Sequence, residues 1–214
     1  MYALIKSAGS LLLLATLLTA CSSPTLKDEP SGEFADQGLH EVRNSGFEWA
    51  WARPQANLPA YRVLDIVDMD LAGTEFSRAM PSGTVRAQWQ TSPRLERDLQ
   101  QLWRDITGRV FSDYDLSADG DRVLRVKAAL TRVAAWRTSS TSNTAPGRSG
   151  GVSAESVRVT AEFTLYDVAS GDLLAVIRDQ RVIGLKEWTR GAGQGLNSSF
   201  NSWAALLHTR ISGR

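Results

Sequence analysis

The chain has 214 residues, and its 24 basic and 23 acidic side chains give a formal net charge of only +1. This balance argues against nucleic acid as a partner and against a polybasic membrane-binding patch. The chain has one cysteine, which excludes an internal disulfide, and 43% of its residues are hydrophobic. We therefore expect a globular domain that is stabilised by its apolar core alone.

The first twenty residues have the pattern of an export signal. Lys6 supplies a positive charge, residues 11–18 form an apolar run, and small residues precede Cys21. The run is shorter than the roughly 20 residues of a transmembrane helix. Leu18-Thr19-Ala20-Cys21 resembles the lipobox of bacterial lipoproteins, which implies cleavage before Cys21 and fatty acyl chains such as palmitate on that residue. The alternative is a free structural cysteine after an ordinary signal peptide.

Three parts of the chain follow from this reading. Residues 1–20 are the signal peptide that is removed, and residues 21–46 are the lipidated cysteine and a polar, proline-containing flexible tether. Residues 47–214 then form a single globular domain. Because Ser22 rather than an aspartate follows the cysteine, we expect the lipid on Cys21 to anchor the protein in the outer membrane, with the domain facing the periplasm.

In the first half of the domain the sequence predicts a strand over residues 61–71 and then a helix. Ser92 is a suitable N-cap, Pro93 suits the first helical position, and Gly108 is a possible end of the helix. The apolar stripe of this helix consists of Leu95, Leu99, Leu102, Trp103 and Ile106.

In the second half, alternating residues predict strands over 122–131, 157–166 and 173–183. A Ser/Gly-rich segment from Thr138 to Ser156 is predicted to be a mobile loop, and Asp167 to Asp172 a hairpin turn. Asn197 or Ser198 is expected to cap a last helix. The fold class is therefore α+β: a two-layer domain with a mostly antiparallel sheet and helices packed on one face.

Four segments, in this order, resemble the uncharacterised envelope lipoproteins grouped as domain of unknown function 3313. They are Trp51-Ala52-Arg53-Pro54 with Tyr61-Arg62-Val63, the strand Arg122 to Thr131, the hairpin Tyr166 to Leu174, and the ending Ser202 to Leu207. The resemblance implies a Gram-negative envelope lipoprotein. It implies no reaction and supplies no catalytic residues.

The sequence offers little for catalysis. His40 falls in the expected tether and His208 beside the last apolar stripe, so neither is placed as the base of a serine nucleophile or as one of a pair of zinc ligands. Asp65, Asp68 and Asp70 crowd the first strand, and we interpret them as polar strand-end residues rather than an acid–base pair. We therefore predict no catalytic residues and a protein that is not an enzyme.

Residues 115–121 resemble the first half of a calcium loop. Asp115, Ser117 and Asp119 supply oxygens, and Gly120 stands at the turn position. Val126 occupies the position where a bidentate glutamate should close the site, so we predict no metal and no cofactor. Residues 191–195 are read as a flexible, glycine-rich connection rather than a phosphate cradle.

The seven tryptophans divide into two groups. Trp103 and Trp203 belong to helix stripes and should lie in the core. The others lie near segment edges, where they could line a groove or close the ends of the core: Trp49, Trp51, Trp89, Trp136 and Trp188. We expect a non-enzymatic lipid-anchored protein that acts by contact with an unidentified envelope protein. The alternative is a periplasmic binder of a small apolar or glycan ligand.

Overall fold

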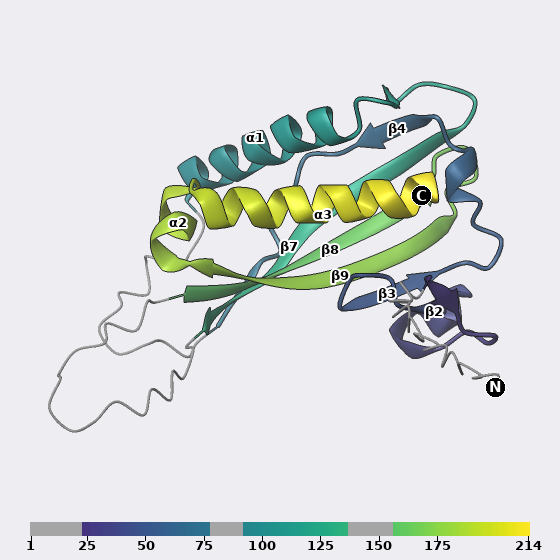
Figure 1. Cartoon of the computed structure of the whole chain (residues 1–214), viewed down its shortest axis with the longest axis horizontal. Helices are drawn as coiled ribbons and strands as arrows, with labels where there is room; N and C mark the ends of the chain where they lie inside the picture. The colour runs from purple at the N-terminus through teal and green to yellow at the C-terminus, as the bar shows by residue number, and fades with distance from the viewer. Residues whose placement is uncertain (1–22, 78–91, 137–155) are drawn as a thin grey trace, which may run out of the picture.

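The computed structural model describes residues 23–77, 92–136 and 156–214 (Figure 1). Cys21 and the lipobox, Trp89 and the loop expected from Thr138 onward lie outside these ranges, except that Ser156 already belongs to a strand. Within the described ranges, no helix combines the length and apolar character that crossing a membrane requires.

Three long antiparallel strands form the centre of the sheet. They are β7 (Val123–Trp136), β8 (Ser156–Asp167) and β9 (Leu173–Gly184). The order of strands across the whole sheet is β1-β2-β3-β9-β8-β7-β4-β6, and β5 also pairs with β7. The shorter strands are β1 (Thr25–Leu26), β2 (His40–Arg43), β3 (Trp49–Ala52), β4 (Val63–Ile66), β5 (Glu75–Phe76) and β6 (Asp115–Leu116). The helices are α1 (Pro93–Val110), α2 (Leu185–Arg190) and α3 (Gln194–Ser212), with 3-10 turns η1 (Gly32–Gln37) and η2 (Leu58–Ala60).

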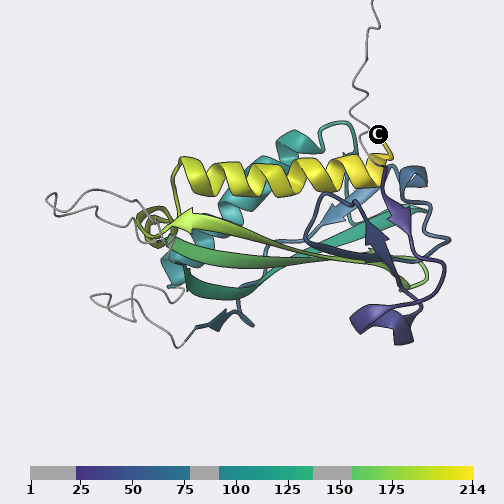
Figure 2. The same ribbon diagram turned by 60° about the horizontal axis from the view of Figure 1, so that its bottom comes forward.

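Helices α1 and α3 lie side by side on one face of this sheet, which confirms the two-layer α+β class (Figures 1 and 2). The face of β8 beneath them carries Val157, Val159, Ala161, Phe163 and Leu165, all fully buried. The Phe163 ring stacks on Trp103 of α1 at a centroid distance of 5.7 Å, and Trp203 of α3 meets Phe163 edge-on at 5.9 Å. The core is therefore the interface between the helices and one sheet face.

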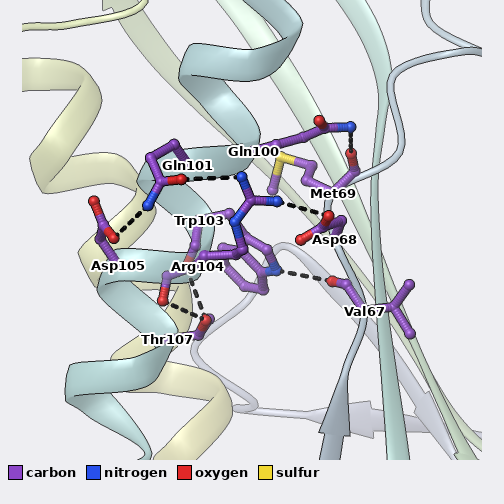
Figure 3. A network of polar contacts seen from close by, with 9 residues as sticks. All are labelled: Val67, Asp68, Met69, Gln100, Gln101, Trp103, Arg104, Asp105 and Thr107. Atoms are coloured by element: carbon purple, nitrogen blue, oxygen red, sulfur yellow. Dashed lines mark hydrogen bonds and ion pairs between the residues drawn. The ribbon is translucent and has the colours of Figure 1, made fainter.

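The first predicted strand is shorter than expected. Strand β4 ends at Ile66, after which the chain meets β7 again at an isolated bridge between Asp70 and Ala129. The pairing of β4 with β7, the Asp70–Ala129 bridge and the pairing of β5 with β7 are all parallel. The sheet is therefore mixed at this edge. The connecting residues are instead held by α1. Trp103 Nε1 donates to the Val67 carbonyl at 3.3 Å and Gln100 Nε2 to the Met69 carbonyl at 3.3 Å (Figure 3).

The predicted start of α1 is confirmed and its predicted end is two residues short. Ser92 Oγ accepts a hydrogen bond from the Leu95 amide at 3.2 Å, and Pro93 is the first helical residue. The helix passes through Gly108 to Val110, since the Phe111 side chain is buried and keeps the last turn packed.

Helix α3 begins at Gln194, earlier than Asn197 or Ser198, and its N-cap is Gly193. The cap is supplied by Glu187 of α2, whose Oε1 accepts from the Gly195 amide at 3.2 Å. Gly193 has a φ of +146°, and a Cβ atom there would lie 2.6 Å from Glu187 Cγ, so this position favours glycine. The glycine-rich segment is therefore a packed corner and not a flexible connection.

Ordered structure begins before Phe47. Strand β1 pairs with β2, and β2 pairs with β3 at the edge of the sheet. Leu39, which precedes β2, is fully buried in a small cluster with Trp51 and Val176. The expectation of a flexible tether throughout residues 21–46 is wrong for residues 25–43, because backbone pairing and this cluster hold them against the domain.

Candidate functional site

Among the residues that the structure describes, few cover the face of the sheet opposite α1 and α3. In Figure 2 the helices lie on one side of the long strands, while the described segments on the other side are η1 at one end and the short β5 at the other. We call this the uncovered face. Its side chains come from alternate residues of β3, β7, β8 and β9: Trp49, Arg132, Thr160, Glu162, Arg178, Gln180 and Val182.

A trough of about 620 Å³ lies across the uncovered face. Glu33 of η1 lines one flank and Gly73 and Glu75 line the other. Thr160 and Gln180, which are paired residues of β8 and β9, lie on the floor between them. The lining thus combines hydrogen-bonding groups of both charges with the rings of two tryptophans, which suits recognition of a polar surface.

Arg178 fixes one end of the trough. Its Nη1 donates to Glu33 Oε2 at 2.6 Å and its Nε to Glu162 Oε2 at 2.7 Å, so that one guanidinium joins η1 to β8 and β9. The hydrogen bond that Arg178 donates to Glu33 raises the pKa of Arg178 and lowers the pKa of Glu33. The guanidinium also lies 5.6 Å from the Phe34 ring centroid and 5.8 Å from that of Trp51. This end of the trough is therefore a fixed wall.

Trp49 presents an apolar ring beside these charges. It is paired with Arg178 across β3 and β9 and is 40% exposed, whereas its neighbour Trp51 is buried against Phe34 with ring centroids 5.1 Å apart. An exposed, rigid aromatic side chain next to hydrogen-bonding groups is typical of binding surfaces. Of the edge tryptophans, Trp49 and Trp51 line the trough, Trp188 is fully buried, and Trp136 lies under Arg158.

A second hollow of about 500 Å³ lies at the C-terminal end of α3, between β1 to β3 and η2. We call it the α3-end cavity. Its lining is mainly apolar, with Phe47, Leu58 and Ile177 among its members. It differs from the trough in chemistry and in position, since it opens beside the helices and not on the uncovered face.

The two histidines have structural partners. His40 lies in β2, not in a tether, and its Nδ1 donates to the Lys27 carbonyl at 2.7 Å. His208 of α3 bonds Asp113 at 2.8 Å through Nε2 and packs on the Phe111 ring. This bond is the main reason why the pKa of Asp113 is lowered. His40 therefore lies in the sheet and His208 in the helical layer, and the structure does not bring the two together.

The three aspartates of the first strand are also separated. Asp65 pairs with Arg125 at 2.6 Å, Asp68 with Arg104 of α1 at 2.7 Å (Figure 3), and Asp70 accepts from the Ala72 amide at 2.8 Å. Each has its own donor, as expected of polar residues at strand ends.

In the segment that resembles the first half of a calcium loop, Asp115 belongs to β6, and Val126 lies inside β7. Ser117 Oγ accepts from the Asp119 amide at 3.0 Å, which closes an ordinary turn. Among the described residues no three His, Cys, Asp or Glu side chains gather closely enough to hold a metal ion.

Comparison with known proteins assigns no family. The chain matches no family model and no curated protein sequence. It is similar to a solved PelC dodecamer structure from Paraburkholderia phytofirmans at 13% identity, covering 76% of this chain and 94% of that chain with a TM-score of 0.38. A minor lipoprotein from Acinetobacter baumannii is 14% identical over 72% and 94% of the two chains, with a TM-score of 0.33. A Xanthomonas campestris protein described as domain of unknown function 330 is 12% identical over 72% and 94%, at 0.32.

These TM-scores are too low to carry an argument about function. The resemblance to domain of unknown function 3313 therefore stays a prediction.

Proposed function

We propose that this protein is a non-enzymatic, lipid-anchored protein of the outer membrane that binds a periplasmic partner protein through the uncovered face of its sheet. The lipobox at Leu18 to Cys21 supports the anchor. The observation that carries the binding activity is the trough of about 620 Å³ with Trp49 exposed beside it.

The charges of the trough favour binding over catalysis. Glu33 and Glu162 both pair with Arg178, and the lowered pKa of Glu33 keeps that carboxyl ionised. A general acid must carry a proton at the working pH, which this pairing opposes. The same fixed charges, together with an aromatic ring, provide the polar rim and the anchor that protein interfaces use.

The α3-end cavity favours a second activity, the binding of an apolar ligand. Its volume of about 500 Å³ is within the range of small-molecule sites, and most of its lining is apolar. Among the described lining residues it shares Trp51 with the trough, and its other lining residues are its own.

The anchor is tested with Cys21→Ala in the full chain. We expect the variant to lack the lipid and to remain as an uncleaved or differently processed precursor, so that its intact mass and its detergent partitioning both change. Separation of inner and outer membranes places the wild-type protein. An unchanged mass and unchanged partitioning of the variant would refute lipidation of Cys21.

The binding face is tested with a photo-crosslinking residue at position 180, on the trough floor, in intact cells. We expect a discrete adduct that is lost in Trp49→Ala. Leu116→Ala is the matched control, because Leu116 is an exposed apolar residue of β6 away from the trough. If both variants, or neither, lose the adduct while melting normally, the uncovered face is not the binding surface.

A further inference from the structure

The α3-end cavity has a lining that is divided by chemistry. Carbon-rich side chains come from β1, β2, β3, η2, β9 and the connection before β3: Leu26, Val42, Phe47, Ala50, Leu58 and Ile177. The lining also includes three arginines, Arg53, Arg210 and Arg214, and no aspartate or glutamate. An apolar hollow with cations alone as its charged groups is complementary to a molecule with an apolar chain and an anionic head.

The arginines are held in place without being neutralised inside the cavity. Arg210 Nε donates to the Ser45 carbonyl at 2.6 Å, and among the described residues no carboxylate pairs with it. Arg53 Nε donates to the Leu173 carbonyl at 2.7 Å, and its contact with Asp172 is long, at 3.7 Å. Arg214 is similarly 3.7 Å from Asp113. These guanidinium groups therefore retain donors for an anion, and arginine favours phosphate in particular.

The position of the cavity supplies the source of such a molecule. Ser23 and Pro24 both line it, and Cys21 precedes Ser23 by only two residues. Two residues span at most about 7 Å, so lipid on Cys21 would hold the cavity at the level of the phospholipid head groups. The neighbouring membrane then offers acyl chains and phosphates at the mouth of the cavity.

We infer that the α3-end cavity takes up one acyl chain of an anionic membrane phospholipid, with the lipid phosphate bound by Arg210 and Arg53. This inference rests on the proposed lipid at Cys21. The protein's own acyl chains fit less well as occupants, because they carry no anionic group for the arginines. An uncharged head group would likewise leave the arginines without a partner.

The test uses the full lipidated protein in phosphatidylcholine vesicles that contain a phosphatidylglycerol probe with a photoreactive acyl chain. We expect labelled peptides from residues 42–58 and 175–177, and weaker labelling with the matching phosphatidylcholine probe. Arg210→Gln should lower phosphatidylglycerol labelling about tenfold, the loss expected for one charge-assisted contact. Ala56→Phe, which fills the cavity, should lower it at least as much.

Two further variants keep the result interpretable. Ala72→Phe adds the same ring at an exposed turn outside the cavity and should label like the wild type. Leu26→Trp narrows the cavity from its exposed edge and should lower labelling even if Ala56→Phe does not fold. Thermal unfolding checks each variant.

The inference is overturned if Ala56→Phe and Leu26→Trp are both labelled as strongly as the wild type. It is also overturned if the phosphatidylglycerol and phosphatidylcholine probes label the wild type equally. Intact mass distinguishes the two failures. A protein without lipid contradicts the proposed anchor, whereas a lipidated protein that is not labelled contradicts the cavity inference alone.

Discussion

The two faces of the same long strands have opposite chemistry. Toward the helices, Trp103, Phe163 and Trp203 pack in contact and are at most 1% exposed. On the uncovered face, Glu162 lies one position from Phe163 and pairs with Arg178 in open surroundings. Successive residues of a strand point to opposite sides, so a single sequence specifies both a packed layer and a charged surface. The first is constrained by volume, while the second is free to meet a partner.

Asp179 shows what the covered face demands of a polar residue. It follows Arg178 in β9, faces the helices and is buried. Its carboxylate accepts from Trp203 Nε1 at 2.8 Å, from the Glu48 amide at 3.1 Å and from Arg181 at 2.9 Å. A buried charge is tolerated because three donors surround it, whereas its neighbour Arg178 is partly exposed and pairs with two carboxylates.

The largest expected effect is on the covered face. Trp203→Ala should lower the free energy of unfolding by about 3–5 kcal/mol, since it leaves a cavity beside Phe163 and removes a donor from Asp179. Trp49→Ala on the uncovered face should change it by at most about 0.5 kcal/mol. Urea denaturation followed by circular dichroism measures both. Similar losses in the two variants would contradict the division of the faces.

An intermediate effect on stability is expected for the hydrogen bond between Tyr61 and Asp167, the last residue of β8. Tyr61 donates through its hydroxyl to Asp167 at 2.5 Å, and burial together with this bond raises the pKa of Tyr61 to about 12. The neutral tyrosine therefore stabilises the fold below its ordinary pKa of 10.0, and this contribution is lost as the pH rises toward 12. Tyr61→Phe should cost about 1 kcal/mol at neutral pH and remove this part of the alkaline loss.

The same bond acts at low pH. It is the main reason why the pKa of Asp167 lies below its ordinary value of 3.8, so the ionised carboxylate stabilises the fold above that pH and the contribution is lost as the pH falls through the lowered pKa. Unfolding midpoints of wild type and Tyr61→Phe across the pH range measure both limbs. Parallel curves would show that the hydrogen bond does not couple to stability.

A small effect is also expected for Arg178→Gln on the uncovered face. Its partner Glu33 has a side chain that is 57% exposed, so solvent screens the pair, and the variant should cost at most about 1 kcal/mol. The difference from wild type should shrink in high salt. Urea unfolding in low and high salt measures this difference. A large loss of unfolding free energy that does not depend on salt would show that Arg178 stabilises the fold as a buried core residue does.

The sequence predicted the parts of the fold that depend on neighbouring residues. Ser92 and Pro93 start α1 as expected, and the alternation in β8 marks its buried side, because capping and strand periodicity are local. Residues 25–43 were missed because their polar composition gives no apolar period. Their order comes from backbone hydrogen bonds at a sheet edge, which side-chain types do not report.

The trough was predictable only in part. Glu162 and Arg178 lie opposite each other across the hairpin whose turn, residues 167–172, was recognised, so their pairing follows from the register. Glu33 lies 145 positions before Arg178 in the chain, and no sequence pattern predicts the contact between them. The placement of His40 in a flexible tether was wrong for the same reason, since His40 is held in β2 by strand pairing.

The place of α3 in the chain bears on how the protein matures. This helix of 19 residues supplies Phe200, Trp203 and Leu207 to the core, yet it follows all three long strands in the chain. Until it emerges, the apolar side of β7, β8 and β9 has only α1 to cover it, and Asp179 lacks the indole that it binds. The core is therefore complete only once α3 has been synthesised, and before that the exposed apolar face of the strands favours aggregation.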